Sequence, residues 1–302
     1  MRDDAALLRL GIIGMSEGNG HPFSWAAIIN GYDVAAMASC PFPGIPQYLG
    51  ERVYPDDFIS GARVTHVWTQ DPLLSRHIAD ASLIETIVER PEDMVGAVDA
   101  VLLARDDAGN HHRFAEPFLR AGIPIYIDKP LALARAKAEA LIGMAASDRH
   151  LFSCTALRYA AELAPTAEQL ARIGRVRMID AWVPKYWDTY AVHAIEPVLQ
   201  AFPALSKARK HDLIISQGIH QLSLVAENGM VGRFTSTGDG LSPIGYRILG
   251  DSGYADLVFR DSFSAFKAAL IRFLAVVRGQ ATNIDRQETL DVVEIIQLGR
   301  RS

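Results

Sequence analysis

The sequence predicts two domains, a doubly wound parallel α/β sheet followed by an α+β domain with a mostly antiparallel sheet. Three observations support this fold class. Apolar, strand-like runs alternate with helical stretches up to about residue 155. Beyond that point, short strand-like runs follow one another across turns such as Glu227-Asn-Gly229 and Asp251-Ser-Gly253. The length of 302 residues suits two hydrophobic cores better than one.

Composition narrows the possible functions. Apolar residues make up 49% and charged residues 22%, which indicates a folded interior. The net charge of −5 argues against a nucleic-acid or anionic-membrane binder. Cys40 and Cys154 lie far apart without metal-ligand spacing, so we expect reduced thiols in a cytoplasmic protein and no metal site. The N-terminal Met1-Arg-Asp-Asp4 does not resemble a signal peptide, and no apolar run reaches the ~18 residues of a membrane span.

The first domain opens with a strand at Leu7–Ile13, a glycine-rich loop and a helix at Phe23–Asn30. Such a loop, placed before a helix N-terminus, suits the pyrophosphate of a dinucleotide. The GxGxxG pattern that would start at Gly14 is imperfect, because Ser16 and Asn19 occupy the later glycine positions. We therefore expect neighbouring glycines to serve in a longer loop. The candidate phosphate-binding residues are Gly14, Ser16, Gly18, Asn19 and Gly20.

Residues 31–61 form a long, proline-containing connection to the next strand. In a doubly wound sheet such connections lie away from the ligand-binding edge, so we expect packing or a subunit contact here. The next strand, Arg63–Thr69, ends where a dinucleotide fold normally places an acid against the ribose hydroxyls. Thr69 stands there, with Asp71 two residues beyond, so NAD and NADP both remain open. Arg76 is a further residue that could pair with a 2′-phosphate.

A polar segment follows the strand predicted at Val98–Ala104 and precedes a helix at Asn110–Ala121. Four polar side chains at the end of one strand exceed what a structural turn requires. Because the carboxyl ends of parallel strands meet at one edge of the sheet, we expect this segment to face the ligand. Its candidate residues are Arg105, Asp106, Asn110 and His111.

The segment Asp128-Lys129-Pro130 follows a buried strand at Ile123–Ile127. Pro130 ends this strand and biases Lys129 towards an extended backbone. An acid and a base are thus placed together at the edge where open α/β sheets bind ligands. We expect Asp128 and Lys129 to contact the cofactor.

We place the domain boundary after residue 155, with a first domain of residues 1–155 and a second of residues 156–302. The first domain is completed by a helix at Leu133–Ala146 and a strand at Leu151–Thr155. In the second, a loop at residues 185–190 precedes a short helix that carries His193 and Glu196. The other expected elements are helices at Ala160–Ile173, Ser262–Arg278 and Arg286–Leu298, and strands at Arg175–Val183, His211–Ser216, Ile219–Ala226, Val231–Thr237, Tyr246–Leu249 and Tyr254–Phe259.

Together these features resemble the Gfo/Idh/MocA family, the relatives of glucose–fructose oxidoreductase and inositol dehydrogenase, nearly from end to end. The segment at Asp128 looks like the Glu-Lys-Pro signature of the family, with Asp in place of Glu. The segments that carry the resemblance are Gly11-Ile-Ile-Gly14, Val98-Asp-Ala-Val101 with Asn110-His111, Ala121-Gly122 ahead of Asp128-Lys129-Pro130, Leu157-Arg-Tyr159 and His193-Ala-Ile-Glu196.

The resemblance implies a Rossmann-type domain that binds NAD or NADP. It also implies hydride transfer between the nicotinamide and a hydroxyl or keto group of a sugar, sugar acid or cyclitol, in a homodimer or homotetramer. On this basis His193 takes the hydroxyl proton and Lys129 stabilises the developing alkoxide. Thr189 replaces the acid that the family carries four residues before the histidine. We expect Asp188 to substitute for it and Glu196 to orient the ring.

The resemblance also assigns a substrate side, formed by Tyr159, Lys185, Trp187 and Tyr190. Arg105 and Asp106 stand where the family often has small and proline residues, which favours a charged substrate such as a sugar acid. Two alternatives remain open. One is a catalytically silent dinucleotide-binding sensor of the same fold. The other is a lyase or epimerase that reduces and reoxidises its cofactor within one cycle.

Overall fold

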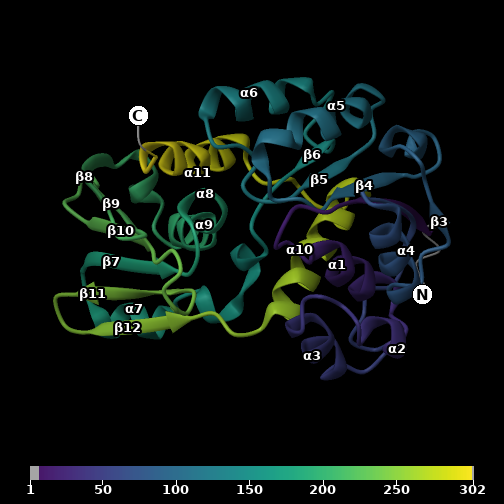
Figure 1. The fold of residues 1–302 in the computed structure, drawn as a ribbon. Coiled ribbons are helices and arrows are strands. Elements are labelled where there is room, and N and C mark those ends of the chain that lie inside the picture. The colour runs from purple at the N-terminus through teal and green to yellow at the C-terminus, as the bar shows by residue number, and fades with distance from the viewer. Residues whose placement is uncertain (1–6, 301–302) are drawn as a thin grey trace. The chain divides into compact units, whose positions relative to one another are not determined.

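The computed structural model describes residues 7–300 and divides the chain into two compact units (Figure 1). The first unit comprises Met1–Asp128, Ala140–Ser153 and Phe266–Ile284. The second comprises Lys129–Glu139, Cys154–Ala265 and Asp285–Ser302. The chain therefore passes between the units repeatedly, whereas we expected a single boundary after residue 155. The N-terminal segment Met1–Asp4, interpreted above as no signal peptide, lies outside the described residues.

The first unit contains a six-stranded parallel sheet in the order β3-β2-β1-β4-β5-β6. The four residues of β4 are all buried, as expected for a central strand covered on both faces. The strand order reverses between β1 and β4, which is where such sheets bind ligands. This confirms the predicted doubly wound sheet. Its strands are β1 (Leu8–Ile13), β2 (Ala62–Trp68), β3 (Thr86–Ile87), β4 (Ala100–Leu103), β5 (Ile125–Ile127) and β6 (Leu151–Phe152).

Helices accompany this sheet much as the apolar periodicity predicts. In α5 the buried residues include Phe114, Phe118 and Leu119, which form the expected apolar face. Helix α6 contains residues of both units. The helices of this part of the chain are α1 (His21–Asn30), α2 (Val34–Met37), α3 (Gly44–Gly50), α4 (Pro72–Ala81), α5 (His111–Arg120) and α6 (Arg135–Met144), with 3₁₀ turns at Pro91–Met94 and Ala108–Asn110.

The connection between α1 and β2 packs beside the glycine-rich loop, not away from it as expected. Tyr48 of α3 donates a hydrogen bond of 2.5 Å to Ser24 in the first turn of α1. A Cβ atom added to Gly20 would lie only 2.6 Å from Phe42 and 2.7 Å from Ile45. The connection therefore runs back along α1 to its N-terminus, because its apolar side chains fill the space that Gly20 leaves open.

Helix α10 (Ser262–Val277) joins the first unit, although it follows the last strand of the second. Figure 1 shows it beside α1. Phe266 lies 6.5 Å from Trp25, and Phe273 lies 5.6 Å from Tyr126 and 5.7 Å from Phe152, measured between ring centroids. This aromatic cluster places α10 in the core of the first unit.

The second unit is built on a six-stranded sheet in the order β12-β11-β7-β10-β9-β8. Only the pairing of β7 with β10 is parallel among the described pairs of this sheet, which confirms the predicted antiparallel character. On one face, ion pairs join Asp180 to Arg233 and Arg247 to Asp256 across neighbouring strands. The strands are β7 (Val176–Val183), β8 (Arg209–Ser216), β9 (Ile219–Val225), β10 (Val231–Ser236), β11 (Gly245–Gly250) and β12 (Tyr254–Val258).

Three predicted elements of the second half differ in the structure. The helix expected at residues 160–173 is broken, because Pro165 interrupts it and Thr166 caps a new helix. The strand expected to reach Thr155 ends at Phe152, and the loop at residues 185–190 contains α8. The helical elements here are 3₁₀ turns at Ala156–Tyr159, Ala161–Leu163 and Pro203–Lys207, and α7 (Ala167–Ile173), α8 (Trp187–Tyr190), α9 (Val192–Ala201) and α11 (Arg286–Leu298).

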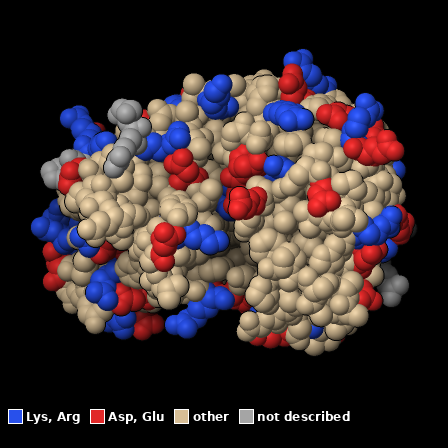
Figure 2. Space-filling model, viewed as in Figure 1, with Lys and Arg blue, Asp and Glu red and all other residues tan. Residues whose placement is uncertain are grey.

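The surface carries charges of both signs. In Figure 2, acidic and basic side chains are interspersed over the visible face of both units. None of the helices described between residues 7 and 300 combines the length and apolar character that crossing a bilayer requires.

Candidate active site

Side chains from the ends of neighbouring strands hold the glycine-rich loop in place. Gln70, after β2, accepts a hydrogen bond from the Met15 N–H (3.1 Å) and donates one to the Met15 carbonyl (2.7 Å). Ser16 donates a hydrogen bond of 2.5 Å to Asp106, after β4. Arg105 donates to both Gln70 (3.0 Å) and the Met15 carbonyl (3.3 Å). These contacts fix the loop where a regular GxGxxG turn is absent.

Asp128 binds the other end of the same loop. Its carboxylate is 1% exposed and accepts a hydrogen bond from Asn19 (2.8 Å). The Nδ1 atom of His21 lies 2.6 Å from the same oxygen. The His21 ring stacks on Trp25 and meets the edge of Phe266, both at 5.0 Å between centroids. Asn19 and Asp128, both predicted cofactor residues, are therefore brought together.

The loop and α1 fit a dinucleotide. Gly14 is required because a Cβ atom there would lie 2.3 Å from the Pro22 ring. Gly18 has a positive φ of 75° with no atom within 4 Å of an added Cβ, so its backbone is open to a ligand. Gly20 precedes α1 without a side-chain cap hydrogen bond. The Asn19 side-chain oxygen accepts a hydrogen bond of 2.8 Å from the His21 N–H, so the first N–H group of α1 is engaged within the protein and the helix dipole remains to attract a pyrophosphate.

The end of β2 supplies polar side chains that are engaged within the protein. The Thr69 hydroxyl donates to the Asp71 carbonyl (2.7 Å) and lies 2.9 Å from the Ser75 hydroxyl. Asp71 caps α4 by accepting a hydrogen bond from Leu73 N–H (2.9 Å). Thr69 and Asp71, both predicted to bind the cofactor, therefore stabilise the start of α4, a role that the sequence did not indicate.

The polar segment after β4 forms a partly buried ion pair. Arg105 donates two hydrogen bonds to Asp107, of 2.9 and 2.6 Å, and Asn110 donates a third of 2.7 Å. Burial opposes ionisation of Asp107, but hydrogen bonds from Arg105 and Asn110 outweigh it and hold its pKa below the usual value. His111 is fully buried with Nε2 2.8 Å from the Arg105 carbonyl. This segment therefore anchors the loop.

In the second unit, Lys129, Lys185 and His193 gather around the ring of Tyr190. Lys129, which is only 3% exposed, places its ammonium 5.6 Å from the ring centroid. Lys185 lies 4.4 Å from the same centroid and donates a hydrogen bond of 2.7 Å to the Tyr190 hydroxyl. The His193 ring meets Tyr190 edge-on at 5.0 Å. Four residues predicted for catalysis or substrate binding thus form one cluster.

Lys185 occupies a strained backbone position. Its φ of 59° falls in the left-handed region that long side chains rarely adopt. The Gly238 N–H donates a hydrogen bond of 2.8 Å to the Lys185 carbonyl and holds this conformation. Strain of this kind concentrates at functional positions, which supports a binding role for the Lys185 ammonium.

Thr155 contacts two predicted catalytic residues and was not singled out from the sequence. Its hydroxyl lies 2.7 Å from Nδ1 of His193, and its backbone N–H donates a hydrogen bond of 2.7 Å to Glu196. Thr155 also caps a 3₁₀ turn by accepting a hydrogen bond from Leu157 N–H (3.3 Å). A threonine two residues before an apolar position is a weak N-cap signal, too common to identify a site.

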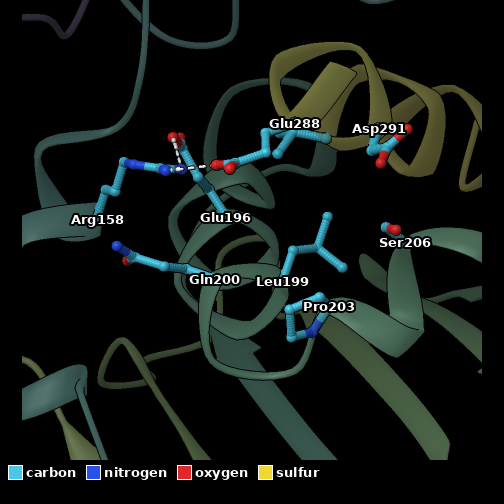
Figure 3. Close-up of a pocket in the computed structure, with 9 residues that line it drawn as sticks. Arg158, Glu196, Leu199, Gln200, Pro203, Ser206, Glu288 and Asp291 are labelled. Atoms are coloured by element: carbon cyan, nitrogen blue, oxygen red, sulfur yellow. Dashed lines mark hydrogen bonds and ion pairs between the residues drawn. The ribbon is translucent and has the colours of Figure 1, made fainter. Parts of the chain in front are cut away.

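Glu196 lies three residues after His193, on a neighbouring face of α9, and lines a cavity of about 320 Å³. Figure 3 shows Arg158 between Glu196 and Glu288, at 3.4 and 2.5 Å from their carboxylates. Burial raises the pKa of Glu196 to about 7, although Arg158 and the Thr155 N–H favour its charged form. Glu196 contacts the His193 partner Thr155, so it reaches the ring indirectly.

Asp188 and Trp187 line a second, open cavity of about 470 Å³ in the same unit. Asp188 is 41% exposed and pairs with Arg300 at 3.1 Å. Trp187 is buried, donates a hydrogen bond of 2.9 Å to the Ile296 carbonyl and stacks on His220. The side chains of these two residues thus turn towards α11 and β9. Tyr159, the last residue of the 3₁₀ turn that Thr155 caps, is half-buried.

Part of the first unit resembles a known oxidoreductase family in sequence. A family model described as "Oxidoreductase family, NAD-binding Rossmann fold" (GFO_IDH_MocA) matches residues 46–155. This confirms the predicted resemblance to the Gfo/Idh/MocA family and the expected nicotinamide dinucleotide. A comparison with curated proteins finds no match.

Solved structures of similar fold cover nearly the whole chain. They include scyllo-inositol dehydrogenase from Lactobacillus casei, with a TM-score of 0.72 and 12% identity over 98% of this chain and 96% of that one. UDP-N-acetylglucosamine 3-dehydrogenase from Acidithiobacillus ferrooxidans has a TM-score of 0.68 and 18% identity over 97% of both chains. Biliverdin reductase from Synechocystis, in complex with biliverdin and NADP⁺, has a TM-score of 0.69 and 14% identity over 96% and 97%. Identities this low show the shared fold alone.

Proposed function

We propose that the protein is an NAD(P)-dependent oxidoreductase that interconverts a hydroxyl and a keto group on a sugar, sugar acid or cyclitol. The observation that carries the proposal is the cluster of Lys129, His193 and Tyr190. Lys129 immediately follows Asp128, which binds the glycine-rich loop. A bound nicotinamide would supply or accept the hydride, and the protein must stabilise the charge on the substrate oxygen and give that oxygen a proton in reduction or take one from it in oxidation.

Within this class we propose a substrate that carries a carboxylate. Lys129 and Lys185 place two ammonium groups 5.6 and 4.4 Å from one aromatic ring. The polar contact of Lys185 described above is with the neutral hydroxyl of Tyr190. If Lys129 acts on the reacting oxygen, the positive charge of the Lys185 ammonium can bind an anionic group elsewhere on the substrate. The dehydrogenases of inositol and of a UDP-sugar that share the fold support a polyhydroxylated substrate.

Replacing Lys129 by Met tests the catalytic assignment. We expect turnover of the best substrate from a panel of aldonates, uronates, sugars and cyclitols to fall at least ~10³-fold, because the charge at the reacting oxygen is lost. Dinucleotide affinity, measured by calorimetry, should change little. Lys137→Met is the matched control, since Lys137 is exposed nearby on α6 and should retain full activity. Normal turnover in Lys129→Met would refute the assignment.

The same panel separates the two alternative functions. A silent sensor would bind the dinucleotide tightly and leave every substrate unchanged. A lyase or epimerase would convert a substrate without net change in NAD(P)H absorbance, and product analysis by mass spectrometry and NMR would show the conversion. Either result replaces the net dehydrogenase proposed here.

A further inference from the structure

We propose that Thr155 fixes the neutral His193 ring as the tautomer protonated on Nε2. His193 then donates a hydrogen bond to the reacting oxygen, and Lys129 carries the proton. This exchanges the two roles expected from the sequence. The assignment of the tautomer stands on the geometry around Thr155, while its catalytic meaning rests on the proposed function.

The hydrogen-bonding capacity of the Thr155 hydroxyl determines which ring nitrogen of His193 is protonated. A hydroxyl has one proton to donate and two lone pairs to accept with. Thr155 is fully buried, so a proton without an acceptor would be costly. The Leu157 N–H can only donate, and it occupies one lone pair at 3.3 Å. Within the described part of the chain, the acceptor for the Thr155 proton is Nδ1 of His193, at 2.7 Å.

The backbone of Thr155 is held independently. Its N–H donates to the buried carboxylate of Glu196 (2.7 Å), three residues after His193 on α9. The hydroxyl and the ring are therefore fixed relative to the same helix. If Nδ1 accepts this proton, the neutral ring carries its own proton on Nε2. The hydroxyl of Thr155 thus selects the tautomer, and Glu196 keeps it in position.

The tautomer determines which residue transfers the proton. A neutral imidazole protonated on Nε2 has no lone pair there to accept a hydroxyl proton, but it can polarise a carbonyl as a hydrogen-bond donor. In reduction, a hydride reaches the carbonyl carbon and the carbonyl π pair moves to oxygen. The ammonium of Lys129 gives that oxygen its proton and becomes an amine. Oxidation reverses each step, so protons and charges balance in both directions.

Nitrogen NMR of protein labelled with ¹⁵N-histidine tests the tautomer without any substrate. We expect His193, assigned by its loss in His193→Gln, to show an unprotonated Nδ1 and a protonated Nε2 at a pH where the ring is neutral. Thr155→Ser keeps the hydroxyl and should keep this pattern. Thr155→Val removes it and should give the averaged signals of mixed tautomers. A wild-type ring protonated on Nδ1 overturns the inference, even if Thr155→Val fails to fold.

Chemical rescue tests the division of roles. In Lys129→Ala, added primary amines should restore the rate at least ~10-fold, because a free amine can replace the proton carrier. In His193→Ala, imidazole should give no comparable rescue, and His193→Gln should retain more activity because its amide still donates a hydrogen bond. Rescue of His193→Ala by imidazole would show that His193, and not Lys129, transfers the proton. If wild-type protein turns over no substrate, the proposed function fails while the NMR result still decides the tautomer.

Discussion

Glu196 is a carboxylic acid on a helix whose other residues from Val192 to Leu199 are also buried. Its polar partners are Arg158 and the Thr155 N–H, and burial is the largest influence on its pKa. The neutral acid is therefore favoured in the folded protein more than in the unfolded chain. This difference couples proton binding at one residue to the free energy of unfolding.

The pH dependence of stability follows from the raised pKa of Glu196. Between its ordinary pKa of 4.5 and the raised value of about 7, the folded state keeps a proton that the unfolded state releases. The contribution of Glu196 to stability is therefore present below pH 4.5 and is lost as the pH rises to 7. A rise of this size corresponds to roughly 3 kcal/mol.

Glu196→Gln removes this titration and should remove the associated loss of stability. We expect the free energy of unfolding of the variant, relative to the wild type, to rise by up to roughly 3 kcal/mol between pH 4.5 and 7. Urea unfolding at several pH values measures it. Glu288→Gln is the control, because Glu288 is exposed and binds the same Arg158. A difference that stays constant with pH in Glu196→Gln would contradict the raised pKa.

At the scale of elements, α1 and its preceding loop are shaped by residues from four other segments. Gln70, Asp106 and Asp128 bind the loop, and α3 packs on the first turn of the helix. Packing against neighbouring side chains, and not only ligand binding, explains why glycine occupies these positions. Gly20 has a φ of −85°, which any residue can adopt, so only its neighbours restrict it.

Gly20→Ala should destabilise the first unit by steric overlap. The added Cβ would lie 2.6 Å from Phe42 and 2.7 Å from Ile45, so α3 must shift. We expect a loss of about 1–3 kcal/mol in urea unfolding, together with weaker dinucleotide binding. Gly44→Ala, in the same segment but with no atom within 4 Å, should cost nothing. Phe42→Ala in the Gly20→Ala background should recover part of the loss, and a failure to do so would refute the overlap.

At the scale of the whole molecule, the first unit is completed by a helix from the far end of the chain. Periodicity predicts that residues 262–278 form a helix, but it cannot say which core the helix joins. Phe266 and Phe273 are suited to any apolar core. In the structure they contact the aromatic rings of Trp25, Tyr126 and Phe152, which belong to the first unit. Position in the sequence alone therefore does not show which unit a late helix joins.

Phe273→Ala tests where α10 belongs. Phe273 is fully buried against Tyr126 and Phe152, so we expect a loss of about 3–5 kcal/mol. Hydrogen exchange should speed up in β1 and β5 of the first unit and change less in β7 and β10 of the second. Ile271→Ala on the same helix, where the side chain is 47% exposed, should have a small effect. Faster exchange confined to the second unit would contradict the assignment.

Local patterns predicted more of the fold than of the site. The buried runs at β1 and β4, the turn at Asn228-Gly229 and the helix faces of α5 could be predicted, because each depends on residues close in sequence. The contacts of Gln70 with Met15, and of Thr155 with His193, join residues 55 and 38 positions apart. A single glutamine or threonine has no periodicity to reveal such a partner.

The family resemblance located Lys129, His193 and Tyr190, which the structure brings into one cluster. It could not show that Arg105 is engaged by Asp107, since an ion pair two residues apart looks the same in sequence as two ligand-binding charges. The resemblance also could not show which way the Asp188 side chain points. The position of one side chain on a four-residue helix depends on the neighbours it meets, here Arg300.

The peptide link between Asp128 and Lys129 has a mechanical consequence. Asp128 is anchored to β4 through its backbone, by a hydrogen bond of 3.0 Å to the Leu103 carbonyl. Lys129 is the first residue assigned to the other unit. Consecutive Cα atoms stay about 3.8 Å apart whatever else moves. The backbone position of Lys129 is therefore set by a residue bound to the parallel sheet, one Cα spacing away, although Lys129 itself belongs to the second unit.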